Sequence, residues 1–356
     1  MLFVQVPDPV ITVQLGGHDV LFPPDHDGRV EMNYFPDEAP AFLSQPDEQP
    51  FRFLMTAANY TVLMEGPNLE NARFVAIVFG PSADGTFDND YAGITSFYRF
   101  APGSLLGFYH AERKETTNGR KWRYWSIGLA SSSDDGKTFQ KVGQILSPAL
   151  PDPLPVKDNL GIGDVCVIEK RNYLYAYYTD ITCRPQSVAA GIGLARCKKT
   201  EATSLTSWRK CSDGRRRYEV IGLGGVGRAI LAKPNYDISQ PHVIHVKKWQ
   251  LYLMVCCVCS HSDHERQTTT ESGIYLFRSS DGTEWTEVRR LFEDFPIPIR
   301  GRSYAAHPSL YLAKIGGSIA EGWLLYCFSE QWKQEPTDPG KPHYMCYRPI
   351  RLTLVG

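Results

Sequence analysis

Carboxylate and histidine side chains recur at the ends of apolar, strand-like segments in this 356-residue chain. Asp37 and Glu38 precede one such segment, Asp164 opens another, and Glu112 follows a strand-like run that ends in His110. Crowded carboxylates take different pKa values, so one can hold a proton while another is ionised. The four acidic residues are therefore candidates for a general acid, a general base and a group that tunes them.

Further polar and aromatic side chains near the same segment ends are candidates for substrate binding. His242 and His307 each adjoin a proline, which holds the backbone extended, and Asp180 ends the second apolar run after Asp164. The predicted binding residues are Tyr91, His110, Trp122, Asp180, His242, Arg302, Tyr304 and His307. An alternative interpretation stays open, in which each carboxylate caps a turn and each histidine is a hydrogen-bonded structural residue.

An internal repeat supplies the elements that would position these side chains. One unit has an apolar run at 164–168, a Tyr-rich run at 173–180, the segment Gly-Ile-Gly-Leu-Ala-Arg at 191–196 and a terminal Ser-Trp at 207–208. Residues 240–285 repeat this order. A unit of this size is typical of a four-stranded propeller blade. The predicted units start near residues 35, 91, 161, 239 and 305.

The repeat predicts an all-β fold, a five-bladed β-propeller that occupies residues 1–356 as a single domain with a central funnel. Residues 10–15 are expected to complete the last blade and close the ring. Residues 132–139 fit the Asp-box pattern Ser-x-Asp-x-Gly-x-Thr-aromatic, which stabilises turns in propellers and says little about activity. Because the innermost strand of each blade lines the axis, acidic residues at blade starts are expected to face the funnel.

Two local motifs indicate cofactor or metal binding but lack the context that such sites need. Residues 222–227 match Gly-x-Gly-x-x-Gly, yet no βαβ unit surrounds them, so a flexible loop is the better interpretation. Cys256, Cys257 and Cys259 stand close to His261, but alternate strand positions point to opposite faces. These cysteines are predicted to be buried thiols, and the sequence predicts neither a cofactor nor a metal.

Composition narrows the classes of partner. The formal net charge is −1 and the pI is about 6.8, so no global field favours nucleic acid or an anionic membrane. The first eight residues lack a basic segment followed by an apolar stretch, and the chain holds nine cysteines. We therefore expect an intracellular protein with a small-molecule substrate and neither a nucleic-acid nor a membrane partner.

The order of apolar blade start, Tyr-rich second strand, Gly-Ile-Gly-Leu-Ala-Arg third strand and Ser-Asp-Gly turn resembles the five-bladed propeller glycosidases of glycoside hydrolase families 43, 32, 68, 117 and 130. The resemblance implies a central pocket with an Asp base or nucleophile, a second tuning Asp and a Glu acid. Asp37 or Glu38 matches the first position, Asp164 the second and Glu112 the third. The leading hypothesis is a glycoside hydrolase-like enzyme that acts on a small glycoside.

Two other functions remain open. Gln240 and His307 stand at blade starts where the resembled families carry acidic residues. This departure motivates a propeller recruited for specialised, for example fungal, metabolism, which would steer a cyclisation or a hetero-Diels–Alder-type cycloaddition by holding its substrate in a reactive geometry. The third hypothesis is a non-catalytic carbohydrate-binding propeller, whose carboxylates only accept hydrogen bonds from sugar hydroxyls.

Overall fold

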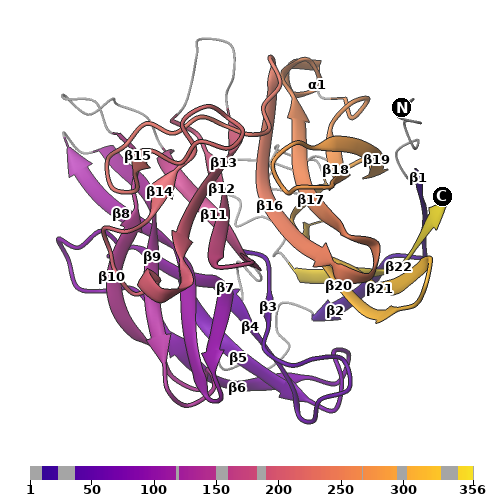
Figure 1. Cartoon of the computed structure of the whole chain (residues 1–356), viewed down its shortest axis with the longest axis horizontal. Coiled ribbons are helices and arrows are strands. Elements are labelled where there is room, and N and C mark those ends of the chain that lie inside the picture. Colours follow the sequence, from indigo (N-terminus) through magenta and orange to yellow (C-terminus); the bar gives the residue numbers. More distant parts are fainter. Residues whose placement is uncertain are drawn as a thin grey trace, which may run out of the picture.

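Five blades of mainly antiparallel strands surround a common axis in the computed structural model (Figure 1), and two of them are joined by a short parallel pairing of β9 with β11. The structure describes residues 10–22, 37–117, 120–149, 159–182, 190–266, 268–294, 303–329 and 344–355. The predicted all-β, five-bladed propeller is confirmed. In this description each blade is numbered in the order in which the chain reaches its innermost strand.

The strands follow one another outward from the axis within each blade. Blade I contains β3 (Ala41–Phe42), β4 (Phe51–Ala57), β5 (Tyr60–Gly66) and β6 (Arg73–Phe79). Blade II contains β7 (Tyr91–Ala101), β8 (Ser104–Thr117), β9 (Arg120–Ser132) and β10 (Gln140–Leu146). Blade III contains β11 (Asn159–Lys170), β12 (Tyr173–Asp180), β13 (Gly191–Lys198), β14 (Arg209–Lys210) and β15 (Val220–Ile221).

The remaining blades follow the same plan. Blade IV contains β16 (Tyr236–Val246), β17 (Leu251–Ser260), β18 (Gly273–Ser279) and β19 (Thr286–Phe292). Blade V contains β20 (Tyr304–Ile315), β21 (Ile319–Ser329), β22 (Tyr344–Val355), β1 (Val10–Leu15) and β2 (Asp19–Phe22). The short helices are η1 (Lys199–Glu201), η2 (Lys247–Trp249) and α1 (His261–Arg266). Among the described residues, no helix has the length and apolar character needed to cross a bilayer.

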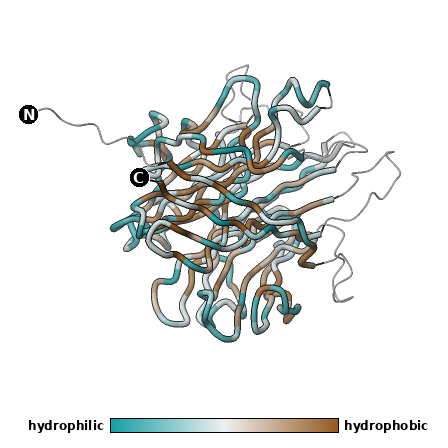
Figure 2. The backbone as a smooth tube through the Cα atoms, turned by 90° about the vertical axis from the view of Figure 1, so that its right-hand side faces the viewer, coloured by the Kyte–Doolittle hydropathy of each residue, from teal (hydrophilic) through white to brown (hydrophobic). Residues whose placement is uncertain are grey.

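The hydrophobic cores lie between neighbouring blades, so the middle strands are buried on both faces. All ten residues of β17 are buried, and their side chains alternate between two cores. Cys256 packs with residues of blade III, whereas Cys257 packs with residues of blade V. Both thiols are free, as the alternation in the sequence predicted. In Figure 2 the hydrophobic stretches lie mainly along the strands and the hydrophilic ones mainly in the outer connections.

Strand β1 pairs with β22, so segments from the two ends of the chain lie side by side in blade V (Figure 1). The antiparallel register runs from Val10 opposite Val355 to Leu15 opposite Ile350. Ile11 and Val13 are buried against the core between blades IV and V. Residues 10–15 therefore form the outer part of the last blade.

Two Ser-Asp turns are held by hydrogen bonds of the same kind. The Ser132 hydroxyl accepts the Gly136 amide and donates to Asp134, whose carboxylate accepts Thr138. In blade IV, Ser279 and Asp281 hold Gly282 and Thr283 in the same way. These bonds satisfy turn amides that lack strand partners, so both turns serve the fold.

Candidate active site at the propeller axis

Three innermost strands carry a bulge at the same structural position. Strand register shifts next to Asp164 in β11, Gln240 in β16 and His307 in β20. Each of these residues adopts a left-handed backbone conformation, with φ of 48°, 57° and 51°. This conformation is costly for a residue with a side chain and is often kept where a side chain must be re-aimed at a functional site. Asp164, Gln240 and His307 line one small cavity at the axis.

Blades I and II complete the cluster. Asp37 and Glu38 directly precede the short inner strand β3, and the Asp37 amide donates to the Thr56 hydroxyl at 2.9 Å. His110 and Glu112 are two residues apart on β8, so their side chains lie on the same face of that strand. Segments from three blades thus bring the sequence-predicted acids Asp37, Glu38, Glu112 and Asp164 together.

His110 occupies the centre of this cluster. Its Nδ1 lies 2.5 Å from Glu38 Oε1 and 3.8 Å from Asp164 Oδ1, and its Nε2 lies 3.9 Å from Glu112 Oε1. The rings of Tyr91 and Trp125 contact the imidazole edge-on. Burial acts to lower the pKa of His110, but the negative charges around Nδ1 outweigh it and raise that pKa well above its ordinary value. The imidazole is therefore a positive centre.

The four carboxylic acids differ in their affinity for protons. Burial, followed by repulsion from Glu112, raises the pKa of Asp37 to about 8. Burial also raises the pKa of Glu112, and burial together with Asp164 raises that of Glu38. Burial opposes ionisation of Asp164 too, but the hydrogen bond and charge of His110 lower its pKa overall. Asp164 thus binds its proton least tightly of the four, and the acids differ in proton affinity as acid–base chemistry requires.

Depth along the axis separates the acids into two pairs. The Asp37 side chain is 38 % exposed and that of Glu112 is 16 % exposed, whereas those of Glu38 and Asp164 are buried. A molecule that enters the site from its solvent-exposed end meets Asp37 and Glu112 before Glu38 and Asp164. The outer pair is therefore placed for proton exchange with a substrate, and the inner pair holds His110.

Arg123 is a site residue that sequence reasoning missed. Its Nε lies 3.2 Å from Glu112 Oε2 and 2.9 Å from Asp90 Oδ2, and Lys114 contacts the same aspartate at 3.2 Å. The positive charge of Arg123 favours the ionised form of Glu112. The pairing of β8 with β9 places Trp125 opposite Glu112. Side chains alternate between two faces along residues 120–132. This alternation could have predicted both Arg123 and Trp125 if it had been known which face points to the site.

Several polar atoms around the cluster have no hydrogen-bond partner among the described residues although they are buried. Four of them belong to His110 itself or to side chains that contact His110 or the central acids. These atoms are Tyr91 Oη, His110 Nε2, Trp125 Nε1 and His307 Nδ1. An unpaired buried polar group costs about 1–3 kcal/mol, so such a concentration is typical of a site that binds a polar molecule.

Two further predicted binding residues lie at the axis with the acids. His307 places Nε2 3.9 Å from Asp37 Oδ1 and Nδ1 3.8 Å from Glu38 Oε2. Burial lowers its pKa to about 4, so this imidazole is neutral at physiological pH. Tyr304 is buried at the start of β20, and burial together with the nearby acids raises its pKa. Gln240, not singled out as a binding residue, accepts the His307 amide at 2.8 Å.

Three predicted binding residues lie elsewhere. Trp122 packs with Tyr124 and Leu160, because its side chain points to the face of β9 opposite Arg123. Asp180 caps a turn, since its Oδ1 accepts both the amide and the hydroxyl of Thr182. His242 follows the bulge of β16 by two residues and lies between the small axial cavity and a second, larger one, since it lines both. Arg302 lies outside the described residues.

Metal binding is the other chemistry that this cluster suggests. Donor atoms of Glu38, His110 and Asp164 all lie within 4.8 Å of one another, alone among such groups in the described ranges. Ligands bound to one transition-metal ion at about 2.1 Å lie roughly 3 Å or more apart. The 2.5 Å contact between Glu38 and His110 is shorter and is that of a charge-assisted hydrogen bond. The observed arrangement is therefore an ion pair.

Comparisons with known proteins place the fold among glycoside hydrolases. No protein-family model matches the sequence, and no curated protein matches it. A solved glycoside hydrolase superposes with a TM-score of 0.59 at 15 % identity over 95 % of this chain and 92 % of that one. A family 117 glycoside hydrolase from Zobellia galactanivorans gives 0.59 at 9 % identity over 96 % and 90 %. An α-L-arabinofuranosidase from Fusarium graminearum gives 0.52 at 10 % identity over 94 % and 97 %.

These identities are low, so the likeness concerns the fold. The chain has the fold of the five-bladed propeller glycoside hydrolases. Its axial residues have to be argued from their own chemistry.

Proposed function

We propose that this protein is a glycoside-active enzyme whose outer carboxyl pair, Asp37 and Glu112, exchanges protons with a substrate held at the mouth of the axial site. The observation that carries the proposal is the geometry of this pair: the Asp37 side chain is 38 % exposed, and the nearby Glu112 faces Arg123 at 3.2 Å. Burial and repulsion from Glu112 raise the pKa of Asp37 to about 8, which supports it. Cleavage of a glycosidic bond needs one carboxylic acid and one carboxylate near the same bond. The fold shared with glycoside hydrolases supports this reaction class.

The order of proton affinity favours Asp37 as the acid. At neutral pH it holds its proton and can donate it to the departing oxygen. Arg123 stabilises the carboxylate of Glu112, which can then activate water or attack the anomeric carbon. This order reverses the roles assigned from the resemblance, in which Glu112 was the acid. Asp164 and His110 are the charged pair deeper in the site, and their charges tune the pKa values of Asp37 and Glu112.

The unpartnered polar atoms support a sugar as the bound group. Tyr91 Oη and Trp125 Nε1 can donate to ring or hydroxyl oxygens, and His307 Nδ1 faces the same space. The neighbouring aromatic rings offer apolar faces, which suit the C–H surfaces of a sugar. A furanoside is the first substrate to try, because one solved structure with this fold is an α-L-arabinofuranosidase.

Leaving-group dependence tests both the reaction and the roles. Wild type, Asp37→Asn and Glu112→Gln are assayed on aryl α-L-arabinofuranosides and a panel of aryl pyranosides with 2,4-dinitrophenyl or 4-methoxyphenyl leaving groups. Loss of the acid spares the dinitrophenyl glycoside, which needs no protonation, and slows the methoxyphenyl glycoside by about 10²–10⁴-fold. Loss of the base slows both. The control is Glu115→Gln, which changes a carboxyl group on the same strand that pairs with Arg113.

Each outcome decides between the hypotheses. If Asp37→Asn and Glu112→Gln both retain wild-type rates on a glycoside that the enzyme cleaves, the assignment is wrong. Turnover of an apolar polyene, with every glycoside left intact, would replace it with the cyclisation or cycloaddition hypothesis. Binding of monosaccharides without turnover of any substrate would support the carbohydrate-binding propeller.

A further inference from the structure

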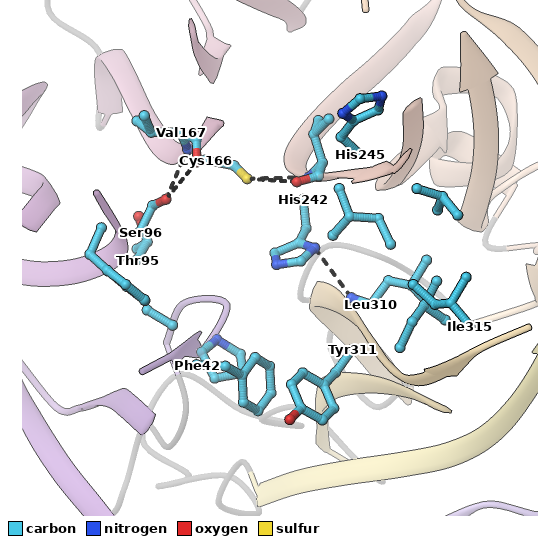
Figure 3. A pocket seen from close by; sticks show the side chains of 17 residues that line it. Phe42, Thr95, Ser96, Cys166, Val167, His242, His245, Leu310, Tyr311 and Ile315 are labelled. Carbon is cyan, nitrogen blue, oxygen red and sulfur yellow. Dashed lines mark hydrogen bonds between the residues drawn. The ribbon is translucent and has the colours of Figure 1, made fainter. Parts of the chain in front are cut away.

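A second cavity of about 300 Å³ lies farther along the same inner strands. Its lining comes from positions that follow the axial cluster in every blade, including Phe42, Ser96, Cys166, His242 and Tyr311. Figure 3 shows these side chains arranged around one space, with the ring of His242 extending into it. A small cavity of about 10 Å³, which Glu38, Asp164 and Gln240 help to line, adjoins it, because Thr95, Cys166 and His242 line both.

Hydrogen bonds from backbone amides to side chains connect neighbouring inner strands around this cavity. Ser96 accepts the Val167 amide at 2.9 Å, and Cys166 accepts the Val243 amide at 3.2 Å. His242 continues the series, because its Nδ1 accepts the Leu310 amide at 3.3 Å (Figure 3). A serine or cysteine has only one polar side-chain atom, and that atom takes part in this bond. A histidine has a second nitrogen.

The bond to Leu310 determines the state of that second nitrogen. An Nδ1 that accepts an amide proton carries none of its own, so the neutral ring holds its proton on Nε2. Burial lowers the pKa of His242 to about 4, which keeps the ring neutral. Within the described residues, no hydrogen bond to Nε2 is present. The cavity therefore has one fixed N–H donor.

The walls around this donor are uncharged and mostly apolar. Phe42 and Tyr311 pack ring against ring at 4.3 Å, and Leu312 and Ile315 add aliphatic surface. None of the described residues that line the cavity is Asp, Glu, Lys or Arg. A charged ligand would lose hydration without gaining a partner, whereas a neutral one would bury apolar surface.

We propose that this second cavity is a binding site for a small neutral molecule with an aromatic or alicyclic body and one carbonyl or ether oxygen, which accepts a hydrogen bond from His242 Nε2. The body packs against Phe42 and Tyr311. The site is separate from the outer acids and does not depend on the reaction proposed for them.

Binding of two isosteric probes tests the proposal. Acetophenone carries the carbonyl oxygen, and α-methylstyrene replaces it with a methylene group. Dissociation constants are measured by saturation-transfer NMR titration for wild type, His242→Phe and Ile315→Trp, the last chosen to fill the cavity. His245 is the second histidine that lines the cavity, but its ring stacks on Tyr252 at 4.3 Å. Phenylalanine preserves that stacking, so His245→Phe is the matched control.

Wild type is expected to prefer acetophenone, and His242→Phe to reduce the ratio of the two dissociation constants by about fivefold, the effect of one neutral hydrogen bond. Ile315→Trp is expected to abolish binding of both probes, and His245→Phe to leave the ratio unchanged. An unchanged ratio in His242→Phe, or unchanged binding in Ile315→Trp, would overturn the proposal. If His242→Phe fails to fold, benzoate decides with wild type alone, since binding as tight as that of acetophenone contradicts a neutral site.

Discussion

Glu38 Oε1 lies 2.5 Å from Nδ1 of His110, although the two residues belong to different blades and are separated by 72 positions in the chain. Both side chains are buried. This contact joins blade I to blade II at the axis and places a positive charge among four carboxyl groups. Its strength and its protonation determine both the stability of the site and its chemistry.

A double-mutant cycle measures the contact directly. We expect Glu38→Gln and His110→Gln each to destabilise the fold, because each leaves a buried partner without its opposite charge. The double variant should lose less than the sum of the two, with a coupling free energy of about 1–3 kcal/mol. Urea denaturation at pH 6 measures the free energy of unfolding of each of the three variants relative to wild type. Additive losses would show that the two side chains do not interact.

The contribution of Asp37 to the stability of the fold should fall as pH rises from 4 to 8. The unfolded chain releases this proton near pH 4, but the folded chain keeps it until about pH 8, so folding is favoured at the acid end of this window. Asp37→Asn cannot ionise and should gain about 1–2 kcal/mol relative to wild type at pH 9. This figure allows for solvent screening, because the side chain is 38 % exposed.

This prediction is tested by measuring the Tm of Asp37→Asn and of wild type between pH 4.5 and pH 9. The gain in Tm should be small at pH 4.5 and reach about 2–4 °C per kcal/mol at pH 9. Asp84→Asn, on a surface turn, serves as the control and should show no trend. A difference that is constant across the range would contradict the pKa of about 8.

The rate of the proposed reaction should depend on the same proton. If Asp37 is the acid, kcat/KM on a glycoside with a poor leaving group falls above pH 8, because the free enzyme loses the proton that it must donate. A dinitrophenyl glycoside should lack this alkaline limb. A limb of the same position and size on both substrates would assign the ionisation to another group.

Gly163 leaves the space that the His110 ring occupies. A Cβ added there would lie 2.7 Å from the imidazole, too close for the ring to keep its place between Glu38 and Asp164. Gly163→Ala should therefore cost about 1–3 kcal/mol of stability and shift the His110 ring resonances in NMR spectra. Gly317→Ala is the control, since no atom lies within 4 Å of its added Cβ. Unchanged His110 resonances in a folded Gly163→Ala variant would refute this packing argument.

The propeller could be predicted because its signal is repeated. Each blade alternates apolar strands with polar turns, and the same order recurs along the chain, so errors in one unit are corrected by another. The prediction of Asp164 and His307 as axial residues rested on the same logic. Residues at equivalent positions of equivalent strands occupy equivalent places around the axis.

Individual side-chain directions could not be predicted so well. Trp122 was predicted as a binding residue, but Trp125 and Arg123 face the site, because a shift of one residue along a strand exchanges its two faces. His242 and His307 both adjoin proline, yet only His307 occupies the left-handed position of a bulge. No residue composition in the sequence shows which face of a strand points to the axis or where a strand has a bulge.

The sequence alone thus determined the repeat, the all-β class and the presence of acids at blade starts, because these depend on local patterns of apolar and polar residues. The tertiary structure decided which acids lie together, which histidine is charged and which is neutral, and that a second cavity lies beyond them. Those properties depend on distances between blades. His110 is positive because Glu38 and Asp164 reach it from two other blades, and His242 is neutral because burial opposes its charge and the Leu310 amide donates to its Nδ1.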